Sequence, residues 1–159
     1  MRMCFTKLVL CTFVCLGALA AKAAPQVNVS FIEPEKFTDL QSTWLRDADL
    51  LSVLSEHLQM LGQKHLGETQ VLNIAITDID LAGSLEYHWR LSPLRVMRDI
   101  SSPRISLRWR LGLTDAMTEV TLRDMAYLSR INRYPDGDPL RYEKLMLDDW
   151  FKRTFPTPK

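Results

Sequence analysis

Two aspartates near the end of a predicted strand form the pattern best suited to chemistry. Asp78 and Asp80 lie at positions i and i+2, so they point to one face if the strand runs that far. Gly83 follows and permits a tight turn. Two carboxylates on one face could hold a hard cation such as calcium, or act as a general acid and base. Acids at a strand end more often cap a turn or pair with arginine, and we expect that role here.

These aspartates define an alternative function, a small metal-dependent or carboxylate-based hydrolase. The candidate acidic cluster comprises Asp78, Asp80, Asp99 and Asp124. The histidines predict no metal site, because His57 and His65 lie eight residues apart on one predicted helix, and we expect His57 to be solvated. The sequence has no nucleophile elbow, phosphate loop or dinucleotide fingerprint. We therefore expect no catalytic residue, metal or cofactor, and a chain that is not an enzyme.

A basic stretch is the second candidate for function. Residues 88–110 contain six arginines and a single acid, Asp99, which gives this segment a charge of +5. Arg104, Arg108 and Arg110 share strand parity, so we expect them on the solvent face of a sheet. A planar guanidinium suits phosphate and carboxylate groups. The arginines could bind an anionic group, or pair with the six acids of residues 33–56.

The preferred hypothesis is a non-catalytic binding module with an Arg-rich sheet face. Its partner would be another envelope protein or an anionic component of the envelope; nucleic acid is not expected. Trp150 is an additional candidate, because Trp150 and Phe151 are adjacent in a predicted helix and cannot both face fully inward. The candidate binding residues are Arg98, Arg104, Arg108, Arg110 and Trp150.

Residues 1–23 have the pattern of a secretory signal peptide. Arg2 and Lys7 precede an uncharged run of 14 residues, and Ala21-Lys22-Ala23 matches a signal peptidase site. All three cysteines lie in this segment, but no small residue precedes Cys11 or Cys15, so a lipoprotein is not expected. We expect a mature periplasmic protein of a Gram-negative bacterium, residues 24–159, with no cysteine and no transmembrane segment. Its formal net charge would be −2 instead of +1.

The remaining residues predict one α+β domain. Alternating apolar residues indicate strands at Val27–Ile32, Gln70–Asp80, Arg104–Leu113 and Met117–Leu122, with a shorter strand within Tyr87–Asp99. Apolar residues spaced by three and four indicate a helix within Asp47–Leu66, and a second helix capped by Asp138-Pro139 and ending before Pro156. We expect a two-layer sandwich: a mostly antiparallel sheet of about five strands, and two main helices.

Several segments together resemble a known family. The segments begin with Phe31-Ile32-Glu33-Pro34 and Thr77-Asp78-Ile79-Asp80, continue with Val96-Met97-Arg98-Asp99 and Leu122-Arg123-Asp124-Met125, and end with Leu147-Asp148-Asp149-Trp150. In this order they resemble the bacterial DUF3016 family. The resemblance implies an exported protein of Gram-negative bacteria. It implies no catalytic residues, because the family is a domain of unknown function.

Overall fold

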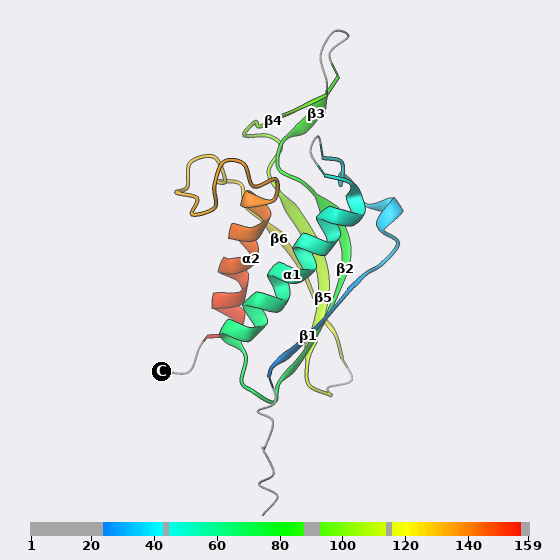
Figure 1. Ribbon diagram of the computed structural model, residues 1–159, viewed down its shortest axis with the longest axis vertical. Coiled ribbons are helices and arrows are strands. Elements are labelled where there is room, and N and C mark those ends of the chain that lie inside the picture. Colours follow the sequence, from blue (N-terminus) through cyan, green and yellow to red (C-terminus); the bar gives the residue numbers. More distant parts are fainter. Residues whose placement is uncertain (1–23, 43–44, 88–92, 114–115, 157–159) are drawn as a thin grey trace, which may run out of the picture.

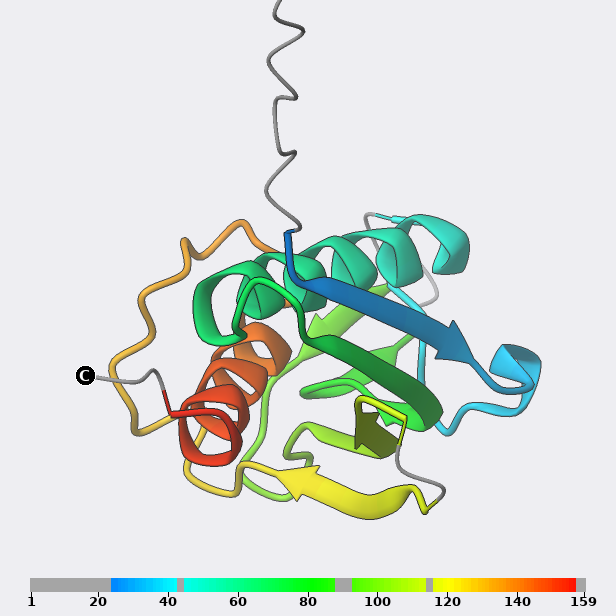
Figure 2. The same ribbon diagram turned by 90° about the horizontal axis from the view of Figure 1, so that it is seen from below.

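The sheet is mixed and lies beneath two helices. The computed structural model describes residues 24–42, 45–87, 93–113 and 116–156. The main sheet has the strand order β1 (Gln26–Phe31), β2 (Val71–Asp80), β5 (Arg104–Leu111) and β6 (Thr118–Arg123). Helices α1 (Asp47–His65) and α2 (Arg141–Thr154) both pack on one face of it (Figures 1 and 2). This is the expected α+β sandwich of two layers.

The strand directions differ from expectation in one respect. β1 and β2 are parallel, whereas β2, β5 and β6 run antiparallel. The long connection through α1 returns the chain to the same end of the sheet, so β2 starts in the direction of β1. A short 3-10 helix, η1 (Pro34–Lys36), begins this connection. Among the described residues the main sheet therefore has four strands, and it is not purely antiparallel.

The predicted strand within Tyr87–Asp99 forms a separate structure. β3 (Ser84–Glu86) pairs with β4 (Leu94–Val96) as a two-stranded antiparallel sheet, and residues 88–92 of the prediction lie outside the described residues. This hairpin projects beyond the end of the main sheet (Figure 1). Gly83, with φ of +79°, begins the hairpin, and a Cβ there would lie 2.6 Å from the carbonyl oxygen of Val96.

The core lies between the helices and the sheet. Of the predicted apolar face of α1, Leu54, Leu58 and Leu61 are buried, whereas Leu51 is only partly buried and Leu50 is buried in its place. α1 comes so close to β1 that a Cβ at Gly62 would lie 2.1 Å from a methyl carbon of Val27. Trp150 of α2 and Phe155, which directly follows α2, pack edge-on against Trp109 of β5, with ring centroids 6.2 and 5.2 Å from that of Trp109.

The start of α2 differs from the predicted cap. Asp138 is not the N-cap, because α2 begins at Arg141 and Leu140 precedes it. Asp138 instead stabilises the preceding turn, where its carboxylate accepts a hydrogen bond from the backbone N–H of Leu140 at 2.9 Å. Within the described ranges, no helix has the length and apolar character needed to span a bilayer. The predicted signal peptide lies outside those ranges.

Candidate functional site

The sheet face opposite the helices carries the predicted arginines. Along β5, Ile105 and Leu107 point into the core and are fully buried, so Arg104, Arg108 and Arg110 point to the other face. Strand register places each of them beside a known neighbour: Arg104 lies between Asp80 and Arg123, Arg108 between Ala75 and Glu119, and Arg110 beside Asn73. We call this side of the main sheet, which carries Arg104, Arg108, Arg110 and their cross-strand neighbours, the open face.

The two candidate aspartates reach this face through a bulge. Strict alternation after the buried residues Leu72, Ile74 and Ile76 would turn Asp78 and Asp80 into the core. The register shifts between Ile76 and Asp78, and Ile79 is the buried residue instead. A bulge adds one residue to the strand and so reverses the faces beyond it. Asp78 and Asp80 therefore share the open face.

Both aspartates have partners. One terminal nitrogen of Arg104 lies 3.3 Å from a carboxylate oxygen of Asp78 and 3.3 Å from one of Asp80. Thr38 donates to Asp78 twice, from its backbone N–H at 2.8 Å and from its hydroxyl at 2.9 Å. These contacts give the two acids the structural role of holding the loop before α1 against the end of β2.

Arg108 and Arg110 are in a different environment. Arg108 is exposed and Arg110 is half-buried. Within the described residues, neither guanidinium forms an ion pair or a hydrogen bond, and the Nε of Arg110 is buried without a partner. Residues two apart on a strand are separated by about 7 Å. The open face therefore presents two neighbouring cations, with the small Ala75 beside Arg108.

Arg98 and Trp150 do not belong to this face. Arg98 follows β4, where it forms an ion pair with Glu86 and lies 3.3 Å from the hydroxyl of Ser84. Trp150 is only 4% exposed, so its candidacy as a surface residue was wrong. Both Trp150 and Phe151 are buried, because α2 packs against α1 as well as the sheet and is covered over a wide arc.

The other two candidate acids lie apart from Asp78 and Asp80. Asp124 is buried and follows β6, where its carboxylate accepts hydrogen bonds from Arg130 at 2.7 Å and from the backbone N–H of Ala126 at 3.0 Å. Asp99 is exposed in the turn after β4. Among the described residues, no three histidine, cysteine, aspartate or glutamate side chains are grouped so that they could hold a metal ion.

Sequence reasoning missed a buried polar cluster between the helices. His57 was expected to be solvated, but it is only 5% exposed and its Nε2 lies 3.2 Å from a carboxylate oxygen of Asp148 on α2. The loop before α2 covers it: the Tyr134 hydroxyl donates to Asp148 at 2.6 Å, and Arg133 forms an ion pair with the same carboxylate. This loop is distant in sequence from His57, so helical periodicity gave no sign of it.

The contacts of this cluster shift two pKa values. Burial alone would raise the pKa of Asp148, but its contacts with His57, Tyr134 and Arg133 outweigh burial and hold that pKa below its usual value. Burial, followed by the hydrogen bond to Asp148, raises the pKa of Tyr134 to about 12. The cluster therefore holds a charged carboxylate and a neutral phenol between the helices.

Glu143 is a second buried acid that was missed. It is 1% exposed, and its carboxylate accepts a hydrogen bond at 2.7 Å from the backbone N–H of Ala82, just beyond β2. Burial raises the pKa of Glu143 to about 7, although the Ala82 hydrogen bond and the charge of Arg95 lower it. Its spacing offered a signal, because Glu143 lies three residues after Leu140 and four before Leu147, on the buried side of α2.

Comparison with known proteins identifies the family and nothing more specific. The family model described as "Protein of unknown function (DUF3016)" matches residues 25–153, most of the chain and nearly all of the described domain. Searches of curated proteins and of solved structures found no match. The chain, with its mixed sheet, two helices and arginine-bearing open face, therefore belongs to the DUF3016 family.

Proposed function

We propose that this chain is a non-catalytic binding module of the bacterial periplasm. Its open face would bind an acidic segment of a partner protein in the envelope. The observation that carries the proposal is the pair Arg108 and Arg110, whose guanidinium groups form no ion pair within the described residues. Guanidinium groups bind carboxylates through paired, charge-assisted hydrogen bonds.

The charges around this pair favour a protein partner over a lipid surface. Glu119 lies beside Arg108, and Asp78 and Asp80 lie farther along the face. A bilayer with anionic headgroups would meet these acids as well as the arginines, and like charges at an interface are unfavourable. A protein segment can place its carboxylates against Arg108 and Arg110 alone.

The hydrolase alternative has less support. Asp78 and Asp80 share the charge of Arg104, and Asp78 also accepts two hydrogen bonds from Thr38. A hydrolase acting through these carboxylates would first have to break those contacts. Asp124 has its own arginine partner. No observation on the described residues favours the acids as a reacting pair, so we propose binding.

Site-specific photo-crosslinking in the producing cells tests the proposal. A photoreactive residue at Ser30, exposed on the open face, should capture a partner through an acidic peptide that mass spectrometry identifies. The same residue at Gln59, exposed on α1, should not capture it. Release of the complex by osmotic shock of intact cells is the expected result for a periplasmic protein.

A charge-matched pair of variants distinguishes a specific face from overall charge. The double variant Arg108→Gln/Arg110→Gln should lose the Ser30 adduct. The double variant Lys152→Gln/Arg153→Gln, which removes two exposed cations from the end of α2, should keep it. Equal loss in both variants, or an adduct through a peptide without acids, would contradict the proposal.

A further inference from the structure

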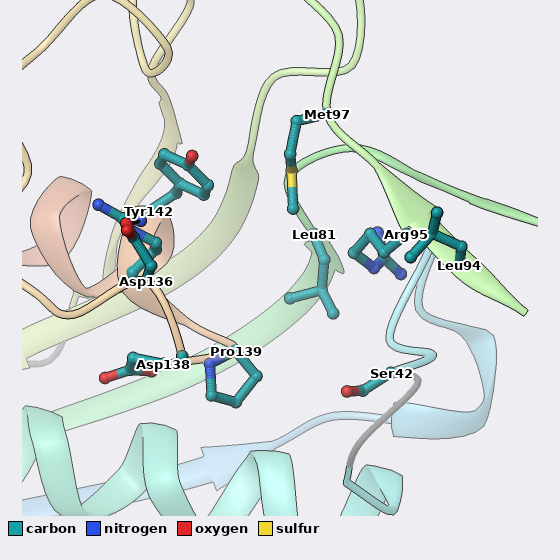
Figure 3. A pocket seen from close by; sticks show the side chains of 11 residues that line it. Ser42, Leu81, Leu94, Arg95, Met97, Asp136, Asp138, Pro139 and Tyr142 are labelled. Carbon is teal, nitrogen blue, oxygen red and sulfur yellow. Dashed lines mark hydrogen bonds and ion pairs between the residues drawn. The ribbon is translucent and has the colours of Figure 1, made fainter.

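A second candidate site lies beneath the projecting hairpin. A pocket of about 460 Å³ opens between β4 and the start of α2. This volume lies within the range of about 300–1,000 Å³ typical of small-molecule sites. Figure 3 shows Arg95 and Leu94 on one side, Tyr142 and Asp136 on the other, and Leu81 between them.

The interior of the pocket is largely apolar. Leu81, which follows β2, is buried at its base, and Met97 extends toward Leu81 from above (Figure 3). Leu94, Pro139 and Tyr142 complete the apolar walls. Such walls fit a hydrocarbon or aromatic group, because removing apolar surface from water is favourable.

One wall carries a cation with a weakly held partner. Arg141, the first residue of α2, forms an ion pair with Asp136, and the side chain of Asp136 is 94% exposed. The Nε of Arg141 is buried and has no hydrogen-bond partner within the part of the chain that the structure describes. An ion pair with so exposed a carboxylate contributes little stability. Another carboxylate could therefore replace Asp136 at low cost.

The other charged side chains of the wall, Arg95 and Asp138, already have ion-pair partners. Arg95 has a side chain that is 10% exposed, and it binds both carboxylate oxygens of Asp39 at 3.0 Å and the carbonyl oxygens of Ala82 and Gly83 at 3.2 Å. Asp138 is paired with Lys144 at 2.6 Å. Among the described residues that line the pocket, Arg141 is therefore the cation whose carboxylate partner is almost fully exposed.

The position of the helix adds to this preference. Leu140 occupies the N-cap of α2 and has no side-chain oxygen to cap the helix, and the backbone N–H of Arg141 donates to the carbonyl oxygen of Asp138 at 3.3 Å. The first turn of a helix carries a partial positive charge. Arg141 and Tyr142, both in that turn, line the pocket. The pocket therefore combines a cationic side chain, the first turn of a helix and an apolar wall.

We propose that this pocket binds a small apolar group that ends in a carboxylate. The carboxylate takes the place of Asp136 on Arg141, and the apolar group lies against Leu81 and Met97. The same chemistry is found in a free aliphatic acid and in the C-terminal residue of a peptide. This site is separate from the open face and does not depend on the function proposed for that face.

Isothermal titration calorimetry on the mature chain tests the proposal with matched probes. Octanoate should bind at least tenfold more tightly than octan-1-ol, which has the same number of carbon atoms and no charge, because hydrogen bonds to charged groups are stronger than hydrogen bonds between neutral groups. The affinities of N-acetyl-leucine and N-acetyl-leucinamide make the same comparison for the C-terminal residue of a peptide. If octanoate binds more tightly than N-acetyl-leucine, the pocket prefers a free aliphatic acid, and the reverse result indicates a peptide C-terminus.

Two substitutions separate carboxylate exchange from a general effect on the pocket. Arg141→Gln should weaken octanoate about tenfold and leave octan-1-ol unchanged. Asp136→Asn should tighten octanoate severalfold, because it removes the competing carboxylate. Because Asp136 is exposed, this variant should fold normally even if Arg141→Gln does not.

A third substitution tests the location. Met97→Trp should abolish binding of octanoate by filling the space above Leu81, whereas Met125→Trp, at an exposed methionine that does not line the pocket, should leave it intact. Equal binding of octanoate and octan-1-ol, no gain with Asp136→Asn, or no binding of either acid would overturn the proposal.

Discussion

The two ends of β5 carry outward arginines whose surroundings differ. At one end, Arg104 lies within 3.3 Å of both Asp78 and Asp80. Toward the other end, Arg108 and Arg110 have the same parity but no ion-pair partner among the described residues. The bulge in β2 brings acids to the first end, while Ala75 and Asn73 are the β2 neighbours at the second and Glu119, opposite Arg108 on β6, forms no ion pair with it. Contacts made in space, and not strand parity alone, therefore decide whether an arginine holds the fold together or remains available.

The helix layer extends this comparison to buried charges. Asp148 lies between α1 and α2 with three partners, and Glu143 has one hydrogen bond in a fully buried site. If partners and burial determine the role of a charge, the cost of removing it should fall from Asp148 to Arg104 and then to Arg108, whereas the buried acid Glu143 should make stability fall as the pH rises. Four measurements test these expectations.

The largest effect is expected for Asp148→Ala. The substitution leaves His57, Tyr134 and Arg133 without their common acceptor, and breaking a buried ion pair costs about 3–5 kcal/mol. Urea denaturation should show a loss of about 3 kcal/mol in the free energy of unfolding. Asp136→Ala, at an exposed acid, is the control and should change it by less than about 0.5 kcal/mol. Similar losses of unfolding free energy in Asp148→Ala and Asp136→Ala would contradict the idea that burial and partners determine the cost of removing a charge.

Glu143 should make stability depend on pH. Its pKa in the folded state is about 7, above the ordinary value of 4.5, so the folded state keeps a proton that the unfolded state loses. Stability from this group is complete below pH 4.5 and falls as the pH rises to about 7, by about 3 kcal/mol in total.

Glu143→Gln isolates this contribution. Glutamine can still accept from Ala82, but it does not ionise, so urea midpoints of the variant should lack the decline between pH 4.5 and 7. The lowered pKa of Asp148 acts in the opposite direction and below pH 3.8, outside this window. Equal pH profiles for variant and wild type would show that burial does not perturb Glu143.

A smaller effect is expected for Arg104→Gln. Asp78 and Asp80 would lose the cation they share and repel each other, but the site is partly exposed and solvent screens it. We expect a loss of about 1 kcal/mol at low ionic strength that shrinks in roughly 1 M salt, because salt screens charges that are partly exposed. A loss that persists at high salt would point to packing instead of charge.

The smallest effect on stability is expected for Arg108→Gln. An exposed side chain without a partner should contribute less than about 0.5 kcal/mol to the free energy of unfolding. The midpoint of thermal unfolding should therefore be the same for this variant as for the wild type, even though the substitution weakens the proposed partner contact. A loss as large as that of Arg104→Gln would mean that Arg108 has a structural partner and would count against the open face as a binding surface.

Local periodicity predicted much of the fold. Leu51, Leu54, Leu58 and Leu61 indicated α1, and the alternation of Ile105, Leu107 and Trp109 correctly placed the arginines of β5 on the outer face. These predictions succeeded because each depends on side chains that are neighbours along the chain. The predicted cap at Asp138 failed because the turn before α2 uses that carboxylate for Leu140.

The candidate sites were less predictable. Asp78 and Asp80 were expected to share a face, but their partner Arg104 follows from pairing between strands. His57 was misplaced because the loop that covers it lies more than 70 residues farther along the chain. The pocket at Arg141 joins segments before α1, after β2, in β4 and at α2. No periodic pattern describes such an assembly.

The sequence by itself determined the fold class, the inner and outer faces of β5 and α1, and the family, because each is encoded in local order or in the succession of segments. Tertiary structure alone decided which charges have partners. Arg104 and Arg108 are four residues apart on one strand. Among the described residues Arg104 forms ion pairs with two acids that a bulge in the neighbouring strand brings to it, whereas Arg108 forms no ion pair even with Glu119 opposite it. Whether two charged side chains form an ion pair depends on the distance between them in space. In this protein those distances are set by strand register, by the bulge in β2 and by the loop that packs over α1.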